Sequence, residues 1–349
     1  DSRTLAAALK GKKNVIAFSY EFENGIKETE YARKIAKLNG WEFHSYIIQK
    51  GYLWNDIIEL SKINQCMTEF THPRQMAVIN EVSTLGDIFL SGSLGDILFE
   101  TYNLPNNSNI TTQVNKIMDL IIKPGGIEIS DALWKYWSLE GNHLESLKKQ
   151  IEQKLLNIEN SNPSNRIRAF KAIHHGSNWT SINMKTFSKY KPVYAPYHDK
   201  KMWQFSCTVP ENHLARRKIQ IEYIKLRAPE LARIPWQKYD LDLYTYKKFN
   251  TTYFPRRAYR FAKRVIDEKL FKKSLLIQRN WELQFIGKNN EKKLEDWLFN
   301  TPQLYELVPN KIVREFYHKF KKVDSVKYSH PISMLLTLAV WCKHYKNID

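Results

Sequence analysis

Short apolar runs alternate with segments of helical periodicity at the start of the chain. Residues 14–22 (NVIAFSYEF) and 43–48 are apolar-rich runs of the length that buried strands have. Residues 28–38, between them, repeat their apolar side chains at helical spacing, and Asn39-Gly40 follows as a helix stop. A strand, a helix and a second strand in this order predict a parallel sheet with crossover helices. The pattern therefore predicts an α/β fold.

The same alternation continues to residue 100. A helix is predicted from Ser2 to a stop at Gly11, and two further helices cover residues 53–63 and 74–84. Residues 87–90 (DIFL) are a short apolar run typical of a buried strand, and a helix-like run begins at Ile97. These elements complete the predicted sheet.

Beyond residue 103 nearly all of the periodicity is helical. A Pro/Asn-rich loop is predicted over 103–109, and 160–165 (NSNPSN) is the best linker candidate. The fold class predicted is a twisted parallel sheet with flanking helices, followed by a largely helical C-terminal part. Helices are predicted over 112–122, 130–139, 144–157 and from 166 onward.

Composition restricts the protein class. With 349 residues, 43% hydrophobic and 26% charged, the chain is globular rather than disordered. Three widely spaced cysteines support neither a disulfide framework nor a zinc site, which favours a cytoplasmic location. The longest apolar run, 334–342, is shorter than the ~20 residues that a membrane span needs.

A net charge of +18 has three explanations. It can serve solubility, it can attract a nucleotide and its pyrophosphate product, or it can attract nucleic acid, which is the least favoured. Residues 247–273 concentrate Lys and Arg between aromatic side chains, a pattern that can clamp RNA, but a solvated basic helix is the preferred interpretation. The adjacent His174-His175 pair is interpreted as a surface pair rather than a metal site, and His72, in the turn before a predicted helix, is assigned no role.

The clearest chemical signal follows the predicted strand at 87–90. Residues 91–96 (SGSLGD) form a small-residue turn before a helix, which can offer backbone N–H groups to a phosphate and a carboxylate to a metal ion. The chain also opens on Asp1-Ser2-Arg3 at the start of a predicted helix. In parallel sheets, ligands bind beyond the carboxyl ends of strands.

Together these two segments resemble motifs of the asparagine synthetase family. Asp1-Ser2 resembles the end of SGGxDS, and residues 91–97 resemble SGExxDE. The resemblance implies an adenine nucleotide α-hydrolase-like, Rossmann-like domain of the ATP-pyrophosphatase (PP-loop) type, whose first strand and SGG turn would precede Asp1. It continues weakly through 191–199, where Pro196 and Asp199 match RxPFxD and Tyr194 replaces the arginine.

The last matching segment is 231–239, in which Lys238 matches a family lysine and Trp236 replaces the usual arginine. The resemblance thus defines an ATP-pyrophosphatase domain over 1–240. Its sheet core covers 1–105 and its helical continuation 106–240, and a basic helical region follows over 241–349.

The resemblance also implies residue roles. Asp1 and Asp96 would hold Mg²⁺, which prefers carboxylate oxygens. Other interpretations remain: helix caps for Ser2 and Asp96, an ordinary strand aromatic for Tyr20, and a surface charge for Lys238. The ATP-binding residues implied are Asp1, Ser2, Tyr20, Ser91 and Gly92, and Lys238 would neutralise pyrophosphate.

Two family glutamates are replaced here, by Ser93 and Ile97. Serine does not act as a base near neutral pH without help, so the acid–base group is open. The predicted function is an amide ligase that adenylates aspartate or a related acid with Mg-ATP and then aminates it. Ammonia would come from glutamine through an N-terminal glutaminase domain outside these residues. The alternatives are an RNA-modifying ATP-pyrophosphatase and a non-catalytic nucleotide-binding paralogue.

Overall fold

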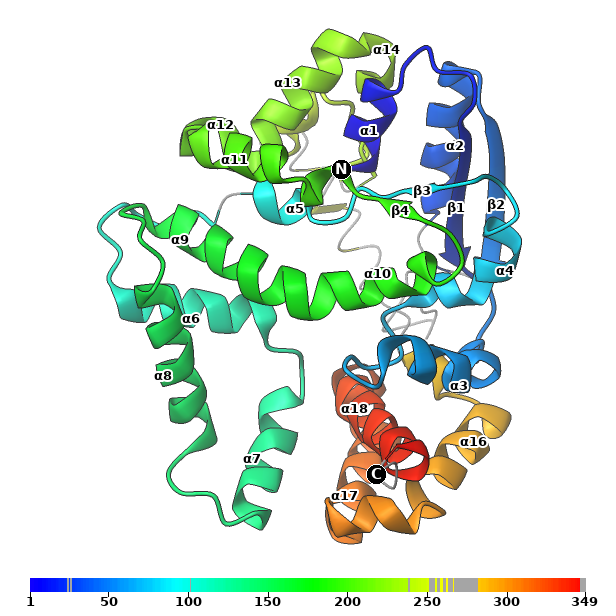
Figure 1. Ribbon diagram of the computed structural model, residues 1–349, viewed down its shortest axis with the longest axis vertical. Helices are drawn as coiled ribbons and strands as arrows, with labels where there is room; N and C mark the ends of the chain where they lie inside the picture. The colour runs from blue at the N-terminus through cyan, green and yellow to red at the C-terminus, as the bar shows by residue number, and fades with distance from the viewer. Residues whose placement is uncertain are drawn as a thin grey trace.

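The fold is seen in a computed structural model of the chain (Figure 1). The described residues are 1–23, 25, 27–100, 102–237, 239–250 and 282–345, and, between 251 and 281, Pro255, Ala258, Tyr259, Ala262 and Ile266.

The two longest strands lie side by side near the chain start. β1 (Ile16–Phe22) pairs in parallel with β2 (Glu42–Ile48), and α2 (Glu28–Asn39) makes the crossover between them (Figure 1). Gly40 ends α2 with a left-handed φ of 68°, which glycine adopts without steric cost. The predicted strand–helix–strand unit and its stop are confirmed.

A second, smaller parallel pair lies beside the N-terminus. β3 (Phe89–Leu90) pairs with β4 (Val193–Tyr194), so segments about a hundred residues apart meet there. Among the described residues, no strand pairing joins this pair to β1 and β2. The α/β class is confirmed in two small parallel sheets with many helices, while the larger twisted sheet is not seen.

Helices make up most of the remaining chain. Before β4 they are α1 (Ser2–Ala8), α3 (Leu53–Asn64), the 3₁₀ helix η1 (Arg74–Val78), α4 (Ile79–Val82), α5 (Gly95–Leu98), α6 (Ile110–Ile121), α7 (Gly126–Tyr136), α8 (His143–Leu156), α9 (Pro163–Phe170), the π-helix η2 (Lys171–Thr180) and α10 (Ser181–Ser188). After β4 they are η3 (Pro196–His198), α11 (Lys200–Thr208), α12 (Glu211–Leu214), η4 (Ala215–Arg217), α13 (Lys218–Arg227), α14 (Pro229–Ala232), η5 (Tyr246–Asn250), η6 (Glu282–Gln284), α16 (Lys288–Phe299), η7 (Pro302–Glu306), α17 (Asn310–Lys322) and α18 (Ser325–His344).

Three predicted elements need correction. The linker expected over 160–165 is wrong in its second half, because Asn162 caps α9 through Asn165 N and Pro163 takes the first helical position. The helix expected from Ile97 is a single turn, α5. The one expected over 74–84 is a 3₁₀ turn followed by the short α4. None of the described helices combines the length and apolar character that a membrane crossing requires.

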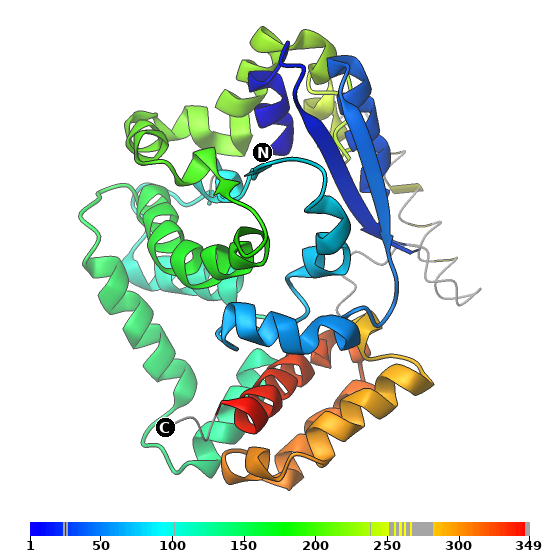
Figure 2. The same cartoon turned by 45° about the vertical axis from the view of Figure 1, so that its right-hand side comes forward.

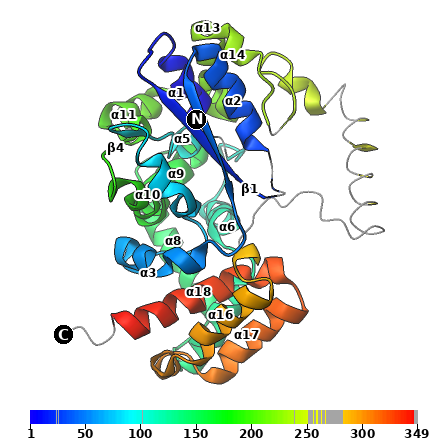
Figure 3. The ribbon, with the colours of Figure 1, turned by 90° about the vertical axis from the view of Figure 1, so that its right-hand side faces the viewer.

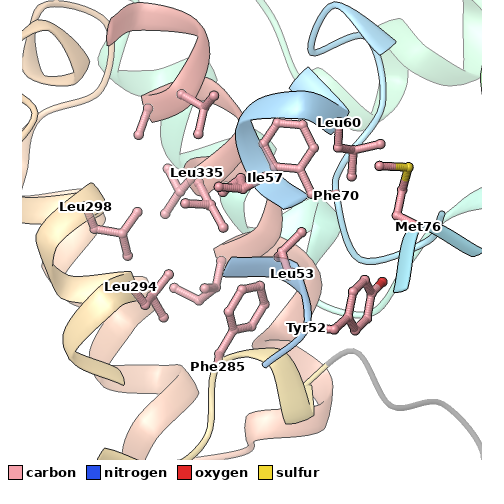
Figure 4. Packing of buried hydrophobic residues seen from close by; sticks show 14 of the residues in the cluster. Tyr52, Leu53, Ile57, Leu60, Phe70, Met76, Phe285, Leu294, Leu298 and Leu335 are labelled. Carbon is pink, nitrogen blue, oxygen red and sulfur yellow. The ribbon is translucent and has the colours of Figure 1, made fainter. Parts of the chain in front are cut away.

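The largest hydrophobic core joins segments from both ends of the chain. Leu53, Leu60 and Phe70 pack with Phe285 and the C-terminal helices α16 and α18 (Figure 4). In Figures 2 and 3 these C-terminal helices pack together at the end of the molecule next to α3. The core therefore draws residues from both sides of position 240, where the domain boundary stays a prediction.

A buried carboxyl group fastens α18 to this core. Glu69 is 1% exposed, and its Oε2 accepts hydrogen bonds from Thr71 N (2.7 Å), Thr71 Oγ1 (2.5 Å) and Ser333 Oγ (2.8 Å). Burial raises the pKa of Glu69, and the hydrogen bonds and Lys123 only partly oppose this. Folding is therefore favoured while the group is protonated, and this contribution is lost as the pH rises through the folded-state pKa.

We expect the Glu69→Gln variant to remove this pH dependence. Relative to the variant, the wild-type free energy of unfolding should fall as the pH rises from 5 to 8, because only the wild type must ionise a buried carboxyl group. Urea unfolding of both proteins at several pH values measures this difference. A difference that does not change with pH would contradict the assignment.

Candidate functional site

The first residue of the chain packs directly on the turn after β3. A Cβ atom placed on Gly95 would lie 2.7 Å from Asp1 Oδ1 and 2.9 Å from Tyr197 Cε2. A Cβ on Gly92 would lie 3.1 Å from Ser2 N and 3.3 Å from Asp1 Cβ. Only glycine allows this close approach. The fold thus brings together the two segments that the sequence singled out, although 90 residues separate them.

The pairing of β3 with β4 holds this turn in place. Ser91 N donates to Tyr194 O (2.9 Å), and Ser93 N donates to Ser91 Oγ (3.2 Å). Leu94 then takes a left-handed conformation with φ 75°, and α5 begins at Gly95. The turn therefore has a defined backbone shape.

The segment after β4 packs beside Asp1 and the turn after β3. Asp199 caps α11, its side chain accepting from Lys201 N at 2.8 Å, and Tyr194 is 57% exposed on β4. The buried Tyr197 ring packs beside Asp1, and Gln220 Nε2 donates to its hydroxyl (3.1 Å). Of the two residues that match the family motif, Asp199 caps α11 and Pro196 begins η3, which carries the Tyr197 ring.

The Asp1 carboxylate is held by side chains that sequence reasoning missed. Arg217 Nη1 and Gln220 Nε2 both lie 3.1 Å from Asp1 Oδ1, and Arg217 Nε lies 3.4 Å from Glu100 Oε2. No hydrogen bond to Asp1 Oδ2 is seen in the described part of the chain. One carboxylate oxygen is therefore fixed and the other is available.

Asp96 is the second carboxylate of the site. It lies in the first turn of α5, exposed and after the cap position, so the interpretation of Asp96 as a helix cap is wrong. The same holds for Ser2, because Asp1 takes the cap position of α1. The negative charge of Asp96 acts on Lys171 and His175 of η2. Burial nevertheless lowers the pKa of Lys171.

A metal ion here would depend on few protein ligands. Among the described residues, no three His, Cys, Asp or Glu side chains gather into a metal-binding group. Mg²⁺ is commonly held by one or two carboxylates together with water and substrate phosphates. Asp1 Oδ2 and Asp96 are the donors that this site offers.

The two remaining predicted residues are Tyr20 and Lys238. Tyr20 is in β1 and packs on the largest core; burial raises its pKa, while the charge of Arg74 opposes this. Lys238 lies outside the described residues. The segment before it is tied to α1, because Arg3 donates to Ile234 O (2.8 Å) and Pro235 O (2.9 Å).

The two replaced positions differ in their surroundings. Ile97 is 2% exposed within a small core with Leu98 and Tyr197, so an ionised side chain there would be buried. Ser93 is half-buried in the turn. Most of the basic segment 247–273, on which the RNA alternative depends, lies outside the described residues.

Comparison with protein-family models identifies the family of the chain. The family model described as Asparagine synthase matches residues 1–343. The matched region continues past Tyr239, where the recognisable motifs end. No curated protein matches the chain.

Proposed function

Because the chain belongs to the asparagine synthase family, we propose that it is an amide ligase that adenylates a carboxylic acid and then aminates it. Members of the family are typically ATP-dependent ligases. The observation that carries the proposal is the contact of Asp1 with Gly92 and Gly95, which puts a carboxylate, a helix start and a glycine turn at one place.

The two carboxylates would hold Mg²⁺ between them and the phosphates. Asp1 is oriented through Oδ1 by Arg217 and Gln220, which leaves Oδ2 for an ion, and Asp96 is exposed on the neighbouring turn. When bound, the ion would offset the charge that develops on the phosphate oxygens. Arg217 would keep the Asp1 side chain in one rotamer before ATP arrives.

The other residues of the proposed site would bind the phosphates, the adenine and the pyrophosphate. Ser2 N lies next to Gly92, and the N–H groups of Ser2 and Gly92 would bind phosphate oxygens. The backbone of Ser91 would contact the nucleotide beside them, while its N–H group stays bonded to Tyr194 O. Tyr20 would line the adenine pocket. Lys238 would neutralise the leaving pyrophosphate as a point charge.

The reaction itself has two displacements. A carboxylate oxygen attacks the α-phosphorus of ATP, the bond to the β-phosphate oxygen breaks, and pyrophosphate leaves. Ammonia, derived from glutamine in a domain outside these residues, then attacks the acyl carbon, and AMP leaves with the bonding electrons. The nitrogen loses its proton to a base, for which Ser93 is unsuited.

The test is acid-dependent release of pyrophosphate from ATP. We expect incubation with Mg-ATP and aspartate or related acids to give AMP and pyrophosphate in equal amounts, and ammonia to give the amide. Mass spectrometry and a coupled pyrophosphate assay measure the products, with a reaction lacking the acid as control. Release of ADP and phosphate, or no AMP with any carboxylate tested, would contradict the proposal; the second outcome would favour a non-catalytic paralogue.

A further inference from the structure

The long helix formed by α9, η2 and α10 runs just below α5 and the turn after β3 in Figure 1. A Cβ atom on Gly176 would lie 3.0 Å from Leu94 Cδ1, so the π-helical part touches the turn. π-helical segments inside α-helices occur frequently at functional sites. The ten π-helical residues here include His175 and Trp179.

Two histidines and a lysine gather around the Trp179 ring. The His72 ring stands edge-on to it with centroids 5.0 Å apart, and the His175 ring is stacked at 6.2 Å. Lys123 Nζ lies 5.8 Å from the Trp179 ring centroid. Residues from three distant parts of the chain thus surround one indole.

The surroundings of His72 are strongly cationic. Burial, followed by the charges of Arg74, Lys123, His330 and His175, lowers the pKa of His72 to about 3. Burial, Lys171 and Lys123 lower the pKa of His175 to about 4, and Asp96 opposes this. The buried carboxyl group of Glu69 interacts with Lys123 and accepts hydrogen bonds from Thr71 and Ser333. Both imidazoles are therefore neutral at pH 7 beside positive charge.

The two imidazoles are also without hydrogen bonds. The Nδ1 atoms of His72 and His175 are buried and have no partner, and neither ring makes any hydrogen bond within the described part of the chain. A protonated imidazole offers two N–H donors and a lysine offers three. An anion would satisfy the imidazole donors and at the same time offset the repulsion among the positive groups.

We propose that His72, His175 and Lys123 form a subsite that binds an oxyanion, a carboxylate or a phosphate group, with protonation of His72. Lys123 also lines a separate open cavity of about 480 Å³ at the end of α6 and the start of α7, whose lining includes Asp119 and Glu128. The charge of Asp96 reaches His175, so the subsite adjoins the proposed ATP site. An acid substrate with a second anionic group would use both the proposed ATP site and this subsite. This extension depends on the proposed function.

Calorimetry on the full chain, without ATP, tests the subsite. Succinate and inorganic phosphate are titrated separately at pH 6 in two cationic buffers of different ionisation enthalpy. We expect one of the two anions to bind with uptake of about one proton, and affinity to rise up to about tenfold per unit of falling pH. Binding of succinate alone identifies a carboxylate subsite and binding of phosphate alone a phosphate subsite. No binding of either, or binding without proton uptake, would overturn the proposal.

A matched pair of variants localises the binding. His72→Gln should weaken the anion at least about tenfold and abolish proton uptake. His174→Gln should change neither, because the His174 ring packs on Phe170 (4.8 Å) instead of Trp179. Equal losses in both variants, or wild-type binding by His72→Gln, would refute the assignment. Thermal unfolding checks that each variant folds, and the two-buffer measurement on the wild type needs no variant. Because ATP is absent, failure of the ligase assay and failure of the subsite are separate results.

Discussion

Replacing Gly95 with alanine is expected to reduce acid-dependent pyrophosphate release by at least about 100-fold. The new Cβ would lie 2.7 Å from Asp1 Oδ1, 2.8 Å from Asp1 Cγ and 2.9 Å from Tyr197 Cε2. These separations are too short for carbon, so the Asp1 side chain and the buried Tyr197 ring must move. Asp1 would then lose the position from which it faces the turn, and overpacking of this kind costs about 1–3 kcal/mol of stability.

Gly86→Ala is the matched control for this change. It lies shortly before β3 on the same segment, nothing lies within 4 Å of an added Cβ, and its φ is not left-handed. Pyrophosphate release and urea unfolding of both variants are compared with the wild type. If Gly95→Ala releases pyrophosphate as fast as Gly86→Ala does, the close approach of Asp1 to the turn is not needed for activity.

Replacing Asp96 with asparagine should reduce the rate of pyrophosphate release by about 10²–10³-fold while leaving stability nearly unchanged. The side chain is exposed and makes no hydrogen bond or ion pair with the described residues, so folding loses little. Activity loses much, because asparagine brings no negative charge to the proposed Mg²⁺ position. Residual activity should need a higher Mg²⁺ concentration, which initial rates across a magnesium titration measure.

Asp87→Asn provides the comparison, since it neutralises an exposed acid at the other end of the same short segment. It should keep the wild-type rate and magnesium requirement. A wild-type rate in Asp96→Asn would remove this residue from the metal site. An equal loss in both variants would mean that the general charge of the segment matters and not a specific ligand.

Local patterns were enough to predict much of the framework. The apolar runs and the helix between them gave β1, α2 and β2 nearly to the residue, since strand and helix periodicities depend on neighbours in sequence. The helices α6 and α8 also begin within two residues of their predicted starts, each after an asparagine cap. The short lengths of β3 and α5 were missed, because their ends depend on pairing with β4 and on Leu94 turning left-handed.

The sequence by itself determined which two segments matter, because a glycine turn with a trailing aspartate and an aspartate before a helix are visible in adjacent residues. Only the tertiary structure decided what surrounds them. Arg217, Gln220 and Tyr197 reach Asp1 from about two hundred residues away, and His72 meets His175 across the Trp179 ring. Such contacts leave no periodic signal in the chain, because they arise when the core joins distant helices and buries polar groups together.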